Sequence, residues 1–199
     1  MIKAVIYDLD LMLHITPMKF SKYFSKEYGV EHDKVLEFFT DEFQDCVKGK
    51  ADLKVEIQKY FKSWNWTKGV DELLRIWHEY GYLEVELIKI AENLKKQGIK
   101  CILSTNNEKY RMEYFNRVHN FDKIFDSILN SWEVGYKKPQ KEMFDRILQV
   151  SNVDKNEILF CDDKPHFIIE AKKYGFLIHH YSDVESFKEE LEKLGISTM

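Results

Sequence analysis

Two aspartates separated by one residue follow the first apolar run of the chain, in the segment AVIYDLDLML. Side chains two apart on an extended chain point the same way, with Cα atoms roughly 6–7 Å apart, so both carboxylates can face one site. A second acidic pair follows the run ILFC. Gathered carboxylates repel one another unless a cation neutralises them, and an all-oxygen ligand set suits Mg²⁺. We therefore expect a magnesium site that involves Asp8, Asp10, Asp162 and Asp163.

Two further segments carry groups that bind anions. ILSTNN ends another apolar run, and KKP lies in a loop that opens a predicted helix. Thr105 and Asn106 stand where we expect a helix to begin, so a hydroxyl and free backbone N–H groups are offered to an anion. Lys138 adds a compact ammonium that can bind both a carboxylate and a phosphoryl oxygen. Ser104 could replace Thr105 through a shift of one residue, and Lys137 could replace Lys138.

Five short apolar runs must position these groups. Each run lacks polar alternation, as strands covered on both faces do, and this favours a parallel sheet. The predicted strands lie at residues 4–7, 99–104, 127–129, 157–161 and 176–178. In a doubly wound sheet the ligand binds at the carboxyl ends of the strands, so the residues that follow each run are expected to meet at one edge.

Amphipathic helices are predicted between the runs. The clearest span residues 83–97, 140–150 and 183–194, each with apolar residues on one face. Gly98 follows the first of these helices, where a helix C-cap belongs. The alternation of strands and helices predicts an α/β fold with a doubly wound parallel sheet.

The segment from about residue 15 to 80 breaks this alternation. Its pattern is helical only, with no convincing strand, so it is a helical insertion after the first strand. Thr16 is the predicted N-cap of its first helix, with Pro17 at the first helical position. We expect residues 1–14 and 81–199 to form the core and residues 15–80 a small all-helical domain. Three of its aromatic residues are expected to pack rather than to contact ligand: Trp64, Trp66 and Trp77.

Composition narrows the class of protein. With 199 residues, of which 44% are hydrophobic, the chain can bury roughly 70% of its unfolded surface. The net charge of −4, with no long basic run, argues against a nucleic-acid partner. Asp8 interrupts the N-terminal apolar run, and no run approaches the 18 apolar residues that span a bilayer, so we expect neither a signal peptide nor a membrane partner.

Cysteine usage indicates the redox compartment. The three cysteines form no CxxC spacing and leave one without a partner, which favours free thiols in a reducing compartment. We therefore expect a cytoplasmic protein. The sequence does not indicate the oligomeric state.

The order of these segments resembles the haloacid dehalogenase-like (HAD) hydrolase superfamily over the whole chain. YDLDLML resembles its hhhDxDGT motif, ILSTNN its strand ending in Thr/Ser-Asn, GYKKP its Lys-Pro motif and ILFCDD its terminal acidic pair. The helical insertion resembles the small mobile cap of the superfamily. A single motif of this kind occurs by chance in many proteins, whereas four in order are specific.

The resemblance implies a Mg²⁺-dependent phosphatase that acts on a small phosphorylated metabolite. Asp8 would be the nucleophile that forms an aspartyl phosphate. Asp10 would protonate the leaving oxygen and then activate water against that intermediate. Asp10 also argues against dehalogenation, because the dehalogenases of this superfamily generally lack the second acid.

The resemblance also implies roles for the remaining groups. Mg²⁺ would be held by Asp8, the backbone carbonyl of Asp10 and Asp163. Asp162 would support the ion directly or through water. The transferring phosphoryl oxygens would be held by Thr105, the amide of Asn106 and Lys138.

One departure from the family pattern keeps alternatives open. The family usually has Gly-Thr or Gly-Val after the second aspartate, whereas this chain has Leu11-Met12. If the backbone at Leu11 is left-handed, leucine costs about 1–2 kcal/mol there. The alternatives are a phosphotransferase or mutase, and a weakly active or inactive HAD-fold binding module. A metal-dependent glycosyltransferase would leave Lys138 idle, and a receiver domain carries its phospho-accepting aspartate on a strand in the middle of the chain.

Overall fold

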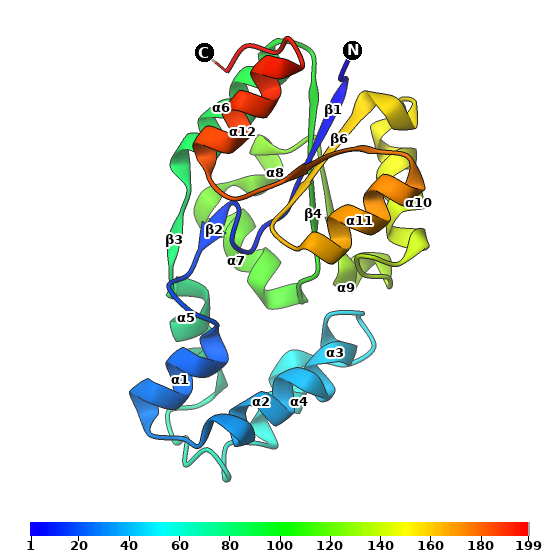
Figure 1. Cartoon of the computed structure of the whole chain (residues 1–199). Coiled ribbons are helices and arrows are strands. Elements are labelled where there is room, and N and C mark those ends of the chain that lie inside the picture. The colour runs from blue at the N-terminus through cyan, green and yellow to red at the C-terminus, as the bar shows by residue number, and fades with distance from the viewer. Residues whose placement is uncertain (199) are drawn as a thin grey trace.

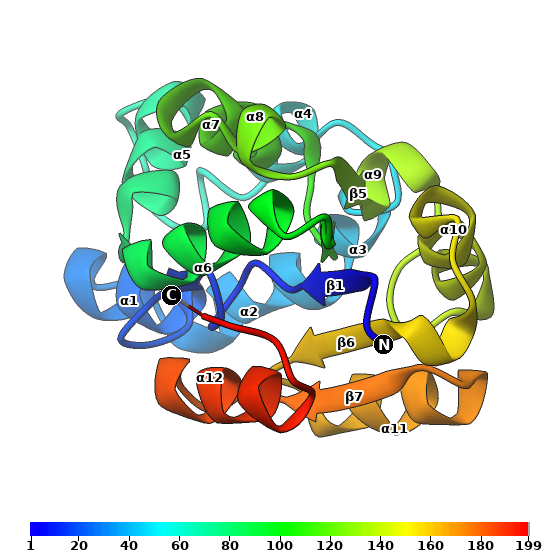
Figure 2. The same cartoon turned by 90° about the horizontal axis from the view of Figure 1, so that it is seen from above.

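A parallel sheet of five strands lies at the centre of the molecule (Figure 1), which is described over residues 1–198 by a computed structural model. Its strands are β1 (Ala4–Tyr7), β4 (Lys100–Thr105), β5 (Ser127–Asn130), β6 (Ile158–Asp162) and β7 (Leu177–His180). They lie in the order β5-β4-β1-β6-β7, so the first strand is central. Figure 2 shows β1, β6 and β7 pointing in the same direction. The predicted α/β fold with a doubly wound parallel sheet is confirmed.

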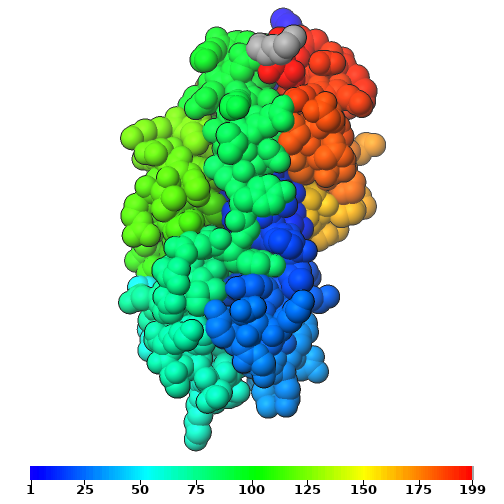
Figure 3. Space-filling view, turned by 90° about the vertical axis from the view of Figure 1, so that its left-hand side faces the viewer, coloured from blue at the N-terminus to red at the C-terminus, as the bar shows by residue number. Residues whose placement is uncertain are grey.

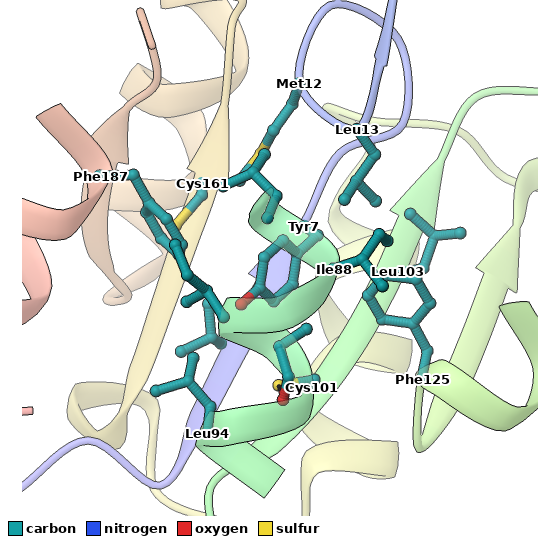
Figure 4. Packing of buried hydrophobic residues seen from close by; sticks show 14 of the residues in the cluster. Tyr7, Met12, Leu13, Ile88, Leu94, Cys101, Leu103, Phe125, Cys161 and Phe187 are labelled. Carbon is teal, nitrogen blue, oxygen red and sulfur yellow. Dashed lines mark hydrogen bonds between the residues drawn. The ribbon is translucent and has the colours of Figure 1, made fainter. Parts of the chain in front are cut away.

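Helices cover both faces of this sheet. One face carries α6 (Val85–Lys96), α7 (Lys109–His119), α8 (Phe121–Ile124) and α12 (Val184–Lys193), and the other carries α10 (Lys141–Ser151) and α11 (Pro165–Tyr174). Figure 4 shows Tyr7 of β1 at the centre of the first face, with Phe187 and Cys101 beside it. The strand residues therefore pack on both faces, which explains why their sequence lacks polar alternation. Two short helices complete the core: α9 (Ser131–Val134) after β5 and the 3₁₀ helix η1 (Lys155–Glu157) before β6.

The helices begin and end where local chemistry requires. In α6 the buried residues Leu87, Ala91 and Leu94 recur at helical spacing on the face toward the sheet. Gly98 follows this helix with φ 82°, a left-handed conformation that suits glycine. Asp183 caps α12 by accepting a hydrogen bond from the backbone N–H of Ser186.

A layer of five helices faces the carboxyl ends of the strands (Figure 1). It contains α1 (Phe20–Tyr28), α2 (His32–Thr40), α3 (Glu42–Cys46), α4 (Leu53–Gln58) and α5 (Val70–Glu79). Its own apolar cluster includes Phe24, Phe38 and Trp64, all buried. Figure 3 shows this layer, coloured blue to teal, as a lobe below the core. We call it the cap; that residues 15–80 act as a separate domain stays a prediction.

Two short strands join the cap to the core, and the sequence did not reveal them. β2 (His14–Ile15) pairs antiparallel with β3 (Tyr82–Leu83). Each strand has only two residues, too few for a periodic pattern. Gly81 lies beside this pair with φ 115°, and an added Cβ would come within 2.5 Å of the carbonyl oxygen of Ile15, so only glycine fits there.

The predicted start of the first cap helix was wrong. α1 begins at Phe20 with Lys19 as its N-cap, whereas Thr16 and Pro17 lie in the preceding loop. The strand pairing keeps the chain extended up to Ile15, and residues 16–19 form the connection to the helix. The helix therefore starts three residues after Pro17.

The three cysteines, Cys46, Cys101 and Cys161, are buried and free. Burial raises the pKa of the Cys101 thiol to about 12, so that thiol stays protonated near neutral pH. None of the helices within residues 1–198 is both long enough and apolar enough to cross a membrane.

Candidate active site

Three buried ionised groups meet at the carboxyl edge of the sheet. Asp8 directly follows β1, Asp162 ends β6, and Lys138 comes from the loop between α9 and α10. The Nζ atom of Lys138 lies 2.7 Å from Oδ1 of Asp8 and 2.6 Å from Oδ2 of Asp162. All three residues are at most 3% exposed. Lys138 thus bridges the first acidic pair to the second across two adjacent strands.

A cluster of carboxylate oxygens stands beside this lysine. Asp8, Asp162 and Asp163 each offer one oxygen, and these atoms all lie within 4.8 Å of one another. The second oxygen of Asp8, Oδ2, is buried without a hydrogen-bond partner. A buried carboxylate oxygen that accepts no hydrogen bond and lies among other carboxylates fits a hard cation such as Mg²⁺. The carboxylate of Asp10 is not part of this cluster, so its predicted contribution rests on its backbone carbonyl.

Lys164 is a second cation at this edge, and it was not predicted as a site residue. Its Nζ atom lies 3.0 Å from Oδ1 of Asp163 and 3.9 Å from Oδ2 of Asp8. Its backbone N–H donates to Oδ1 of Asp162 at 2.9 Å. Lys138 was expected to be able to bind a carboxylate, and Lys164 adds a second ammonium that neutralises part of the acidic charge. The position of Lys164 directly after the acidic pair was the available signal.

Asp10 points to a different set of partners. Arg111 of α7 donates to Oδ1 of Asp10, and Asn107 donates to Oδ2 at 2.9 Å. The same side-chain amide of Asn107 lies 2.8 Å from the hydroxyl oxygen of Thr105, and Nη2 of Arg111 lies 3.2 Å from Nδ1 of His14. Arg111 and Asn107 were not predicted as site residues. They fix the carboxylate of Asp10 apart from the cluster around Asp8.

The loop after β4 differs from the predicted helix start. α7 begins at Lys109, with Glu108 as its N-cap, so Thr105 and Asn106 precede the helix by several residues. The side chain of Asn106 is engaged with the backbone of Lys138, accepting from its N–H at 2.7 Å and donating to its carbonyl at 2.9 Å. This pair of hydrogen bonds holds the lysine loop against β4. Only the backbone amide of Asn106 is therefore a candidate for binding phosphate.

The sequence left two choices open, Lys137 or Lys138 and Ser104 or Thr105. The members of each pair have different surroundings. Lys137 turns to the cap, where its Nζ atom lies 2.7 Å from Oε1 of Gln44, while Lys138 enters the site. Ser104 is fully buried and its hydroxyl has no hydrogen-bond partner. Thr105 instead contacts the side chain that holds Asp10. Lys138 and Thr105 are thus the members of each pair that lie among the acidic residues.

The two aspartates of the first motif differ in their ionisation. Burial, together with the nearby Asp162, raises the pKa of Asp8 to about 6, although the ammonium of Lys138 opposes this shift. Burial also disfavours the charged form of Asp10, but the guanidinium of Arg111 and the hydrogen bond from Asn107 outweigh it and lower the pKa of Asp10. Pairs of titratable groups whose pKa values are shifted in opposite directions are typical of acid–base sites.

Leu11 adopts a left-handed backbone conformation, which was raised above as a possibility for the turn after the second aspartate. Its φ is 65°, and its side chain is 43% exposed. It lies in a tight turn in which its N–H donates to the carbonyl of His14 at 2.9 Å and the N–H of His14 donates to that of Leu9 at 2.8 Å. The next residue, Met12, is fully buried in the core. The departure from the family pattern therefore places a strained leucine between core and cap.

A cavity of about 430 Å³ lies between the cap and the strand ends. The core side of this cavity includes polar groups near the acidic residues: Asp10, Asn106, Asn107, Arg111 and Lys164. The cap side includes Trp77, which was expected to pack rather than to contact a ligand. In the structure it packs in the cap and also lines the cavity. Asp10 and Lys164 line it, so the cavity borders the edge of the sheet where the carboxylates meet.

A profile of the haloacid dehalogenase-like hydrolase family matches residues 5–180. The chain belongs to this family. The predicted superfamily and the prediction of a hydrolase are thereby confirmed.

Among characterised relatives, the sesquiterpene phosphatase of Aspergillus oryzae is 26% identical over 111 residues, which cover 56% of this chain and 57% of that protein. The match thus spans less than two thirds of that relative. Pyrophosphatase PpaX of Bacillus mycoides is 22% identical over 190 residues, covering 87% of this chain and 80% of that protein.

A solved HAD family enzyme from Bacteroides thetaiotaomicron, in complex with magnesium and inorganic phosphate, has the same fold. Its TM-score is 0.78 at 16% identity, and the match covers 92% of this chain and 95% of that chain. At that identity the likeness shows the fold alone. Mg²⁺, the predicted cofactor, is the ion bound in that structural relative.

Proposed function

We propose that this HAD-like hydrolase is a Mg²⁺-dependent phosphatase that hydrolyses a small phosphorylated metabolite through an aspartyl phosphate on Asp8. The observation that carries this proposal is the buried arrangement of Asp8, Lys138 and Asp162, with Asp10 two residues from Asp8 and lining the cavity. A phosphatase and a pyrophosphatase among the relatives support the same class of reaction.

In the first half of the reaction, a carboxylate oxygen of Asp8 attacks the phosphorus of the monoester. A bond forms between this oxygen and phosphorus while the bond from phosphorus to the ester oxygen breaks. The ester oxygen takes a proton from the acid form of Asp10 and leaves as an alcohol. In the free site the guanidinium of Arg111 lowers the pKa of Asp10 and so favours its carboxylate form. The proton that Asp10 gives to the ester oxygen is therefore the one it gains from water in the second half of the preceding turnover, or from the monoanion of the substrate.

In the second half, Asp10 is a carboxylate and can accept a proton. Water attacks the phosphorus of the aspartyl phosphate and gives this proton to Asp10. The bond between phosphorus and Asp8 breaks, so inorganic phosphate leaves and both aspartates return to their starting forms. Lys138, the hydroxyl of Thr105 and the backbone amide of Asn106 would stabilise the negative charge on the phosphoryl oxygens.

The charges of the site favour a divalent cation when phosphate is bound. Four aspartates face three cations, and the latter are Lys138, Lys164 and Arg111. A bound phosphate dianion adds two further negative charges to this site. Mg²⁺ held by Asp8, Asp163, the backbone carbonyl of Asp10 and, directly or through water, Asp162 would supply the positive charge that offsets them.

Hydrolysis of p-nitrophenyl phosphate with Mg²⁺ tests this proposal. We expect turnover that stops with EDTA and falls at least about 1,000-fold in Asp8→Asn, because the nucleophile is lost. Asp122→Asn, an exposed aspartate in α8, is the matched control and should retain full activity. Turnover that persists in Asp8→Asn would refute the proposed nucleophile. Absence of turnover over a broad panel of phosphorylated metabolites would favour a binding module, and transfer of phosphate to an alcohol rather than to water would indicate a phosphotransferase.

A further inference from the structure

The cavity between cap and core has two chemically different halves. Its core side is polar except for Leu11. Its cap side is dominated by large apolar side chains contributed by Phe20, Leu36, Phe39, Phe43, Trp77 and Tyr80. A phosphate monoester has the same division between a charged group and an alcohol part. The alcohol part of a substrate seated at Asp8 would therefore face the apolar half.

The apolar half is preorganised by ring packing. Trp77 stacks on Phe20 with ring centroids 5.1 Å apart, and Phe39 meets the same indole edge-on at 5.1 Å. Phe43 contacts it at 5.4 Å. Rings that support one another lose little conformational freedom when a ligand binds. The cap thus presents an aromatic wall whose rings, Phe20, Phe39, Phe43 and Trp77, pack against one another.

The cap side offers few groups to a hydroxylated ligand. Its polar groups belong to Thr16, Lys19, Ser21 and Thr40, together with the hydroxyl of Tyr80. The hydroxyl of Ser21 pairs with His32, and that of Thr40 donates to helix carbonyls of α2. A sugar or polyol bound against the rings would lose hydrogen bonds to water that the wall does not replace. The wall therefore disfavours polar alcohols.

Leu11 extends the apolar surface to the core side. Its backbone is left-handed, where glycine would avoid strain, and its side chain lines the cavity. Leu11 also lies between Asp10 and the buried Met12, so it is adjacent in the chain to the proposed acid. A strained residue that reaches into a ligand site is consistent with a functional constraint on its side chain.

We propose that the substrate is the phosphate monoester of an apolar, ring-bearing alcohol, and that Leu11 and the aromatic wall select it. This inference rests on the proposed phosphatase function and names the class of alcohol that the site accepts. Selection follows from burial of apolar surface against the wall, which polar alcohols of similar size cannot match.

A pair of substrates with alkyl leaving groups tests the selection without relying on an activated ester. For the wild-type protein with Mg²⁺, we expect kcat/KM for 2-phenylethyl phosphate to exceed that for glycerol phosphate by about 30-fold or more, as expected for burial of one ring. Equal values, or a preference for glycerol phosphate, would overturn the inference.

Two variants locate the selection in the cavity. Leu11→Gly removes the apolar side chain on the core side, and Leu36→Asn makes one cap residue polar at a position that is 38% exposed. Each should lower the ratio of the two kcat/KM values about tenfold. Val55→Asn is the matched control, because Val55 is an exposed apolar residue of the cap that does not line this cavity. It should keep the wild-type ratio, and an equal loss in this control would overturn the assignment.

A binding measurement separates failure of the inference from failure of the proposed function. Asp8→Asn lacks the nucleophile, so titration calorimetry with each ester reports binding without turnover. Tighter binding of 2-phenylethyl phosphate without hydrolysis by the wild type would support the apolar site and refute the phosphatase. Hydrolysis that requires Asp8, with no preference for the aromatic ester in rate or in binding, would support the phosphatase and refute the apolar site.

Discussion

The carboxyl edge of the sheet and the cap wall that faces it hold their side chains in opposite ways. At the edge, Lys138 is 1% exposed and its ammonium lies within 2.7 Å of two buried carboxylates. In the cap, Trp77 is held by ring contacts with three phenylalanines. Ion pairs of this kind depend strongly on distance and on partner, whereas ring packing tolerates changes of shape.

The difference shows how one fold can keep its chemistry while it changes its substrate. A change at the edge leaves a charge unpaired inside the protein, so few substitutions are tolerated there. A substitution in the wall that keeps the volume of the side chain alters the polarity of the cavity at a lower cost, whereas truncation of a buried cap ring remains costly. We therefore expect changes at the edge to respond to Mg²⁺ and changes in the cap to be insensitive to it.

Lys138→Ala should have the largest combined effect on stability and on turnover. It leaves Asp8 and Asp162 buried without their shared cation, which we expect to lower the free energy of unfolding by about 3–5 kcal/mol in EDTA. Turnover should fall at least about 100-fold, because a group that stabilises the phosphoryl oxygens is lost. Added Mg²⁺ should restore part of the stability. Urea unfolding with and without Mg²⁺ measures this, with Lys137→Ala as the control; equal stability of both variants would contradict the ion-pair account.

Phe38→Ala tests the other side of the comparison. Phe38 is fully buried in the cap cluster, so its truncation should cost about 3–5 kcal/mol. The loss should be the same in Mg²⁺ and in EDTA. Tryptophan fluorescence in urea reports mainly on the cap, since three of the four tryptophans lie in it and only Trp132 of α9 lies in the core. Val55→Ala, which changes an exposed cap residue, should shift stability by less than about 0.5 kcal/mol. A Mg²⁺-dependent loss in Phe38→Ala would show that the two regions are coupled.

The raised pKa of Asp8 predicts a pH dependence of stability in EDTA. The folded pKa of about 6 lies above the ordinary value of 3.8, so between about pH 4 and 6 the folded state binds more protons than the unfolded state. The contribution of Asp8 to the free energy of unfolding should therefore fall as pH rises through this window, on the order of 2–3 kcal/mol. Burial lowers the pKa of His14 to about 4, which gives a contribution of opposite sign in the same window, so the effect of Asp8 is measured as a difference from a variant that lacks its carboxyl group.

Asp8→Asn is the control for this pH dependence, because the group that titrates is replaced by an amide. Chemical unfolding of both proteins at several pH values between 4 and 7 measures the difference. Parallel profiles for the two proteins would show that the titrating group is not Asp8. Mg²⁺ should reduce the slope for the wild type, since the ion favours the ionised carboxylate.

Leu11→Gly should change the free energy of unfolding least, and it should raise rather than lower it. Relief of the left-handed leucine should stabilise the protein by about 1 kcal/mol, less what glycine loses in chain entropy. For a protein of this size the melting temperature would rise by at most about 2–4 °C. Leu11→Ala keeps the strained backbone with a Cβ and should not gain. A gain in Leu11→Ala equal to that in Leu11→Gly would mean that backbone strain is not the cause.

Much of the fold and part of the site could be predicted from the sequence. The five strands were located because their apolar runs are buried on both faces, and Asp8, Thr105 and Asp162 were placed at one edge because parallel strands end together. The left-handed backbone at Leu11 was anticipated as a condition of the family turn. These features depend on local patterns and on the rule that orders strands in a sheet.

Contacts between distant segments could be decided only by the tertiary structure. Asp10 and Arg111 are 101 positions apart, and their pairing depends on how α7 is rotated against the sheet. The strands β2 and β3 are too short to leave a pattern, and the aromatic wall is assembled from α1, α2, α3 and α5 together with adjoining residues. The sequence by itself determined which groups can do chemistry. Packing decided which groups touch and what the cavity admits, because side-chain contacts depend on the orientation of whole elements rather than on neighbouring residues.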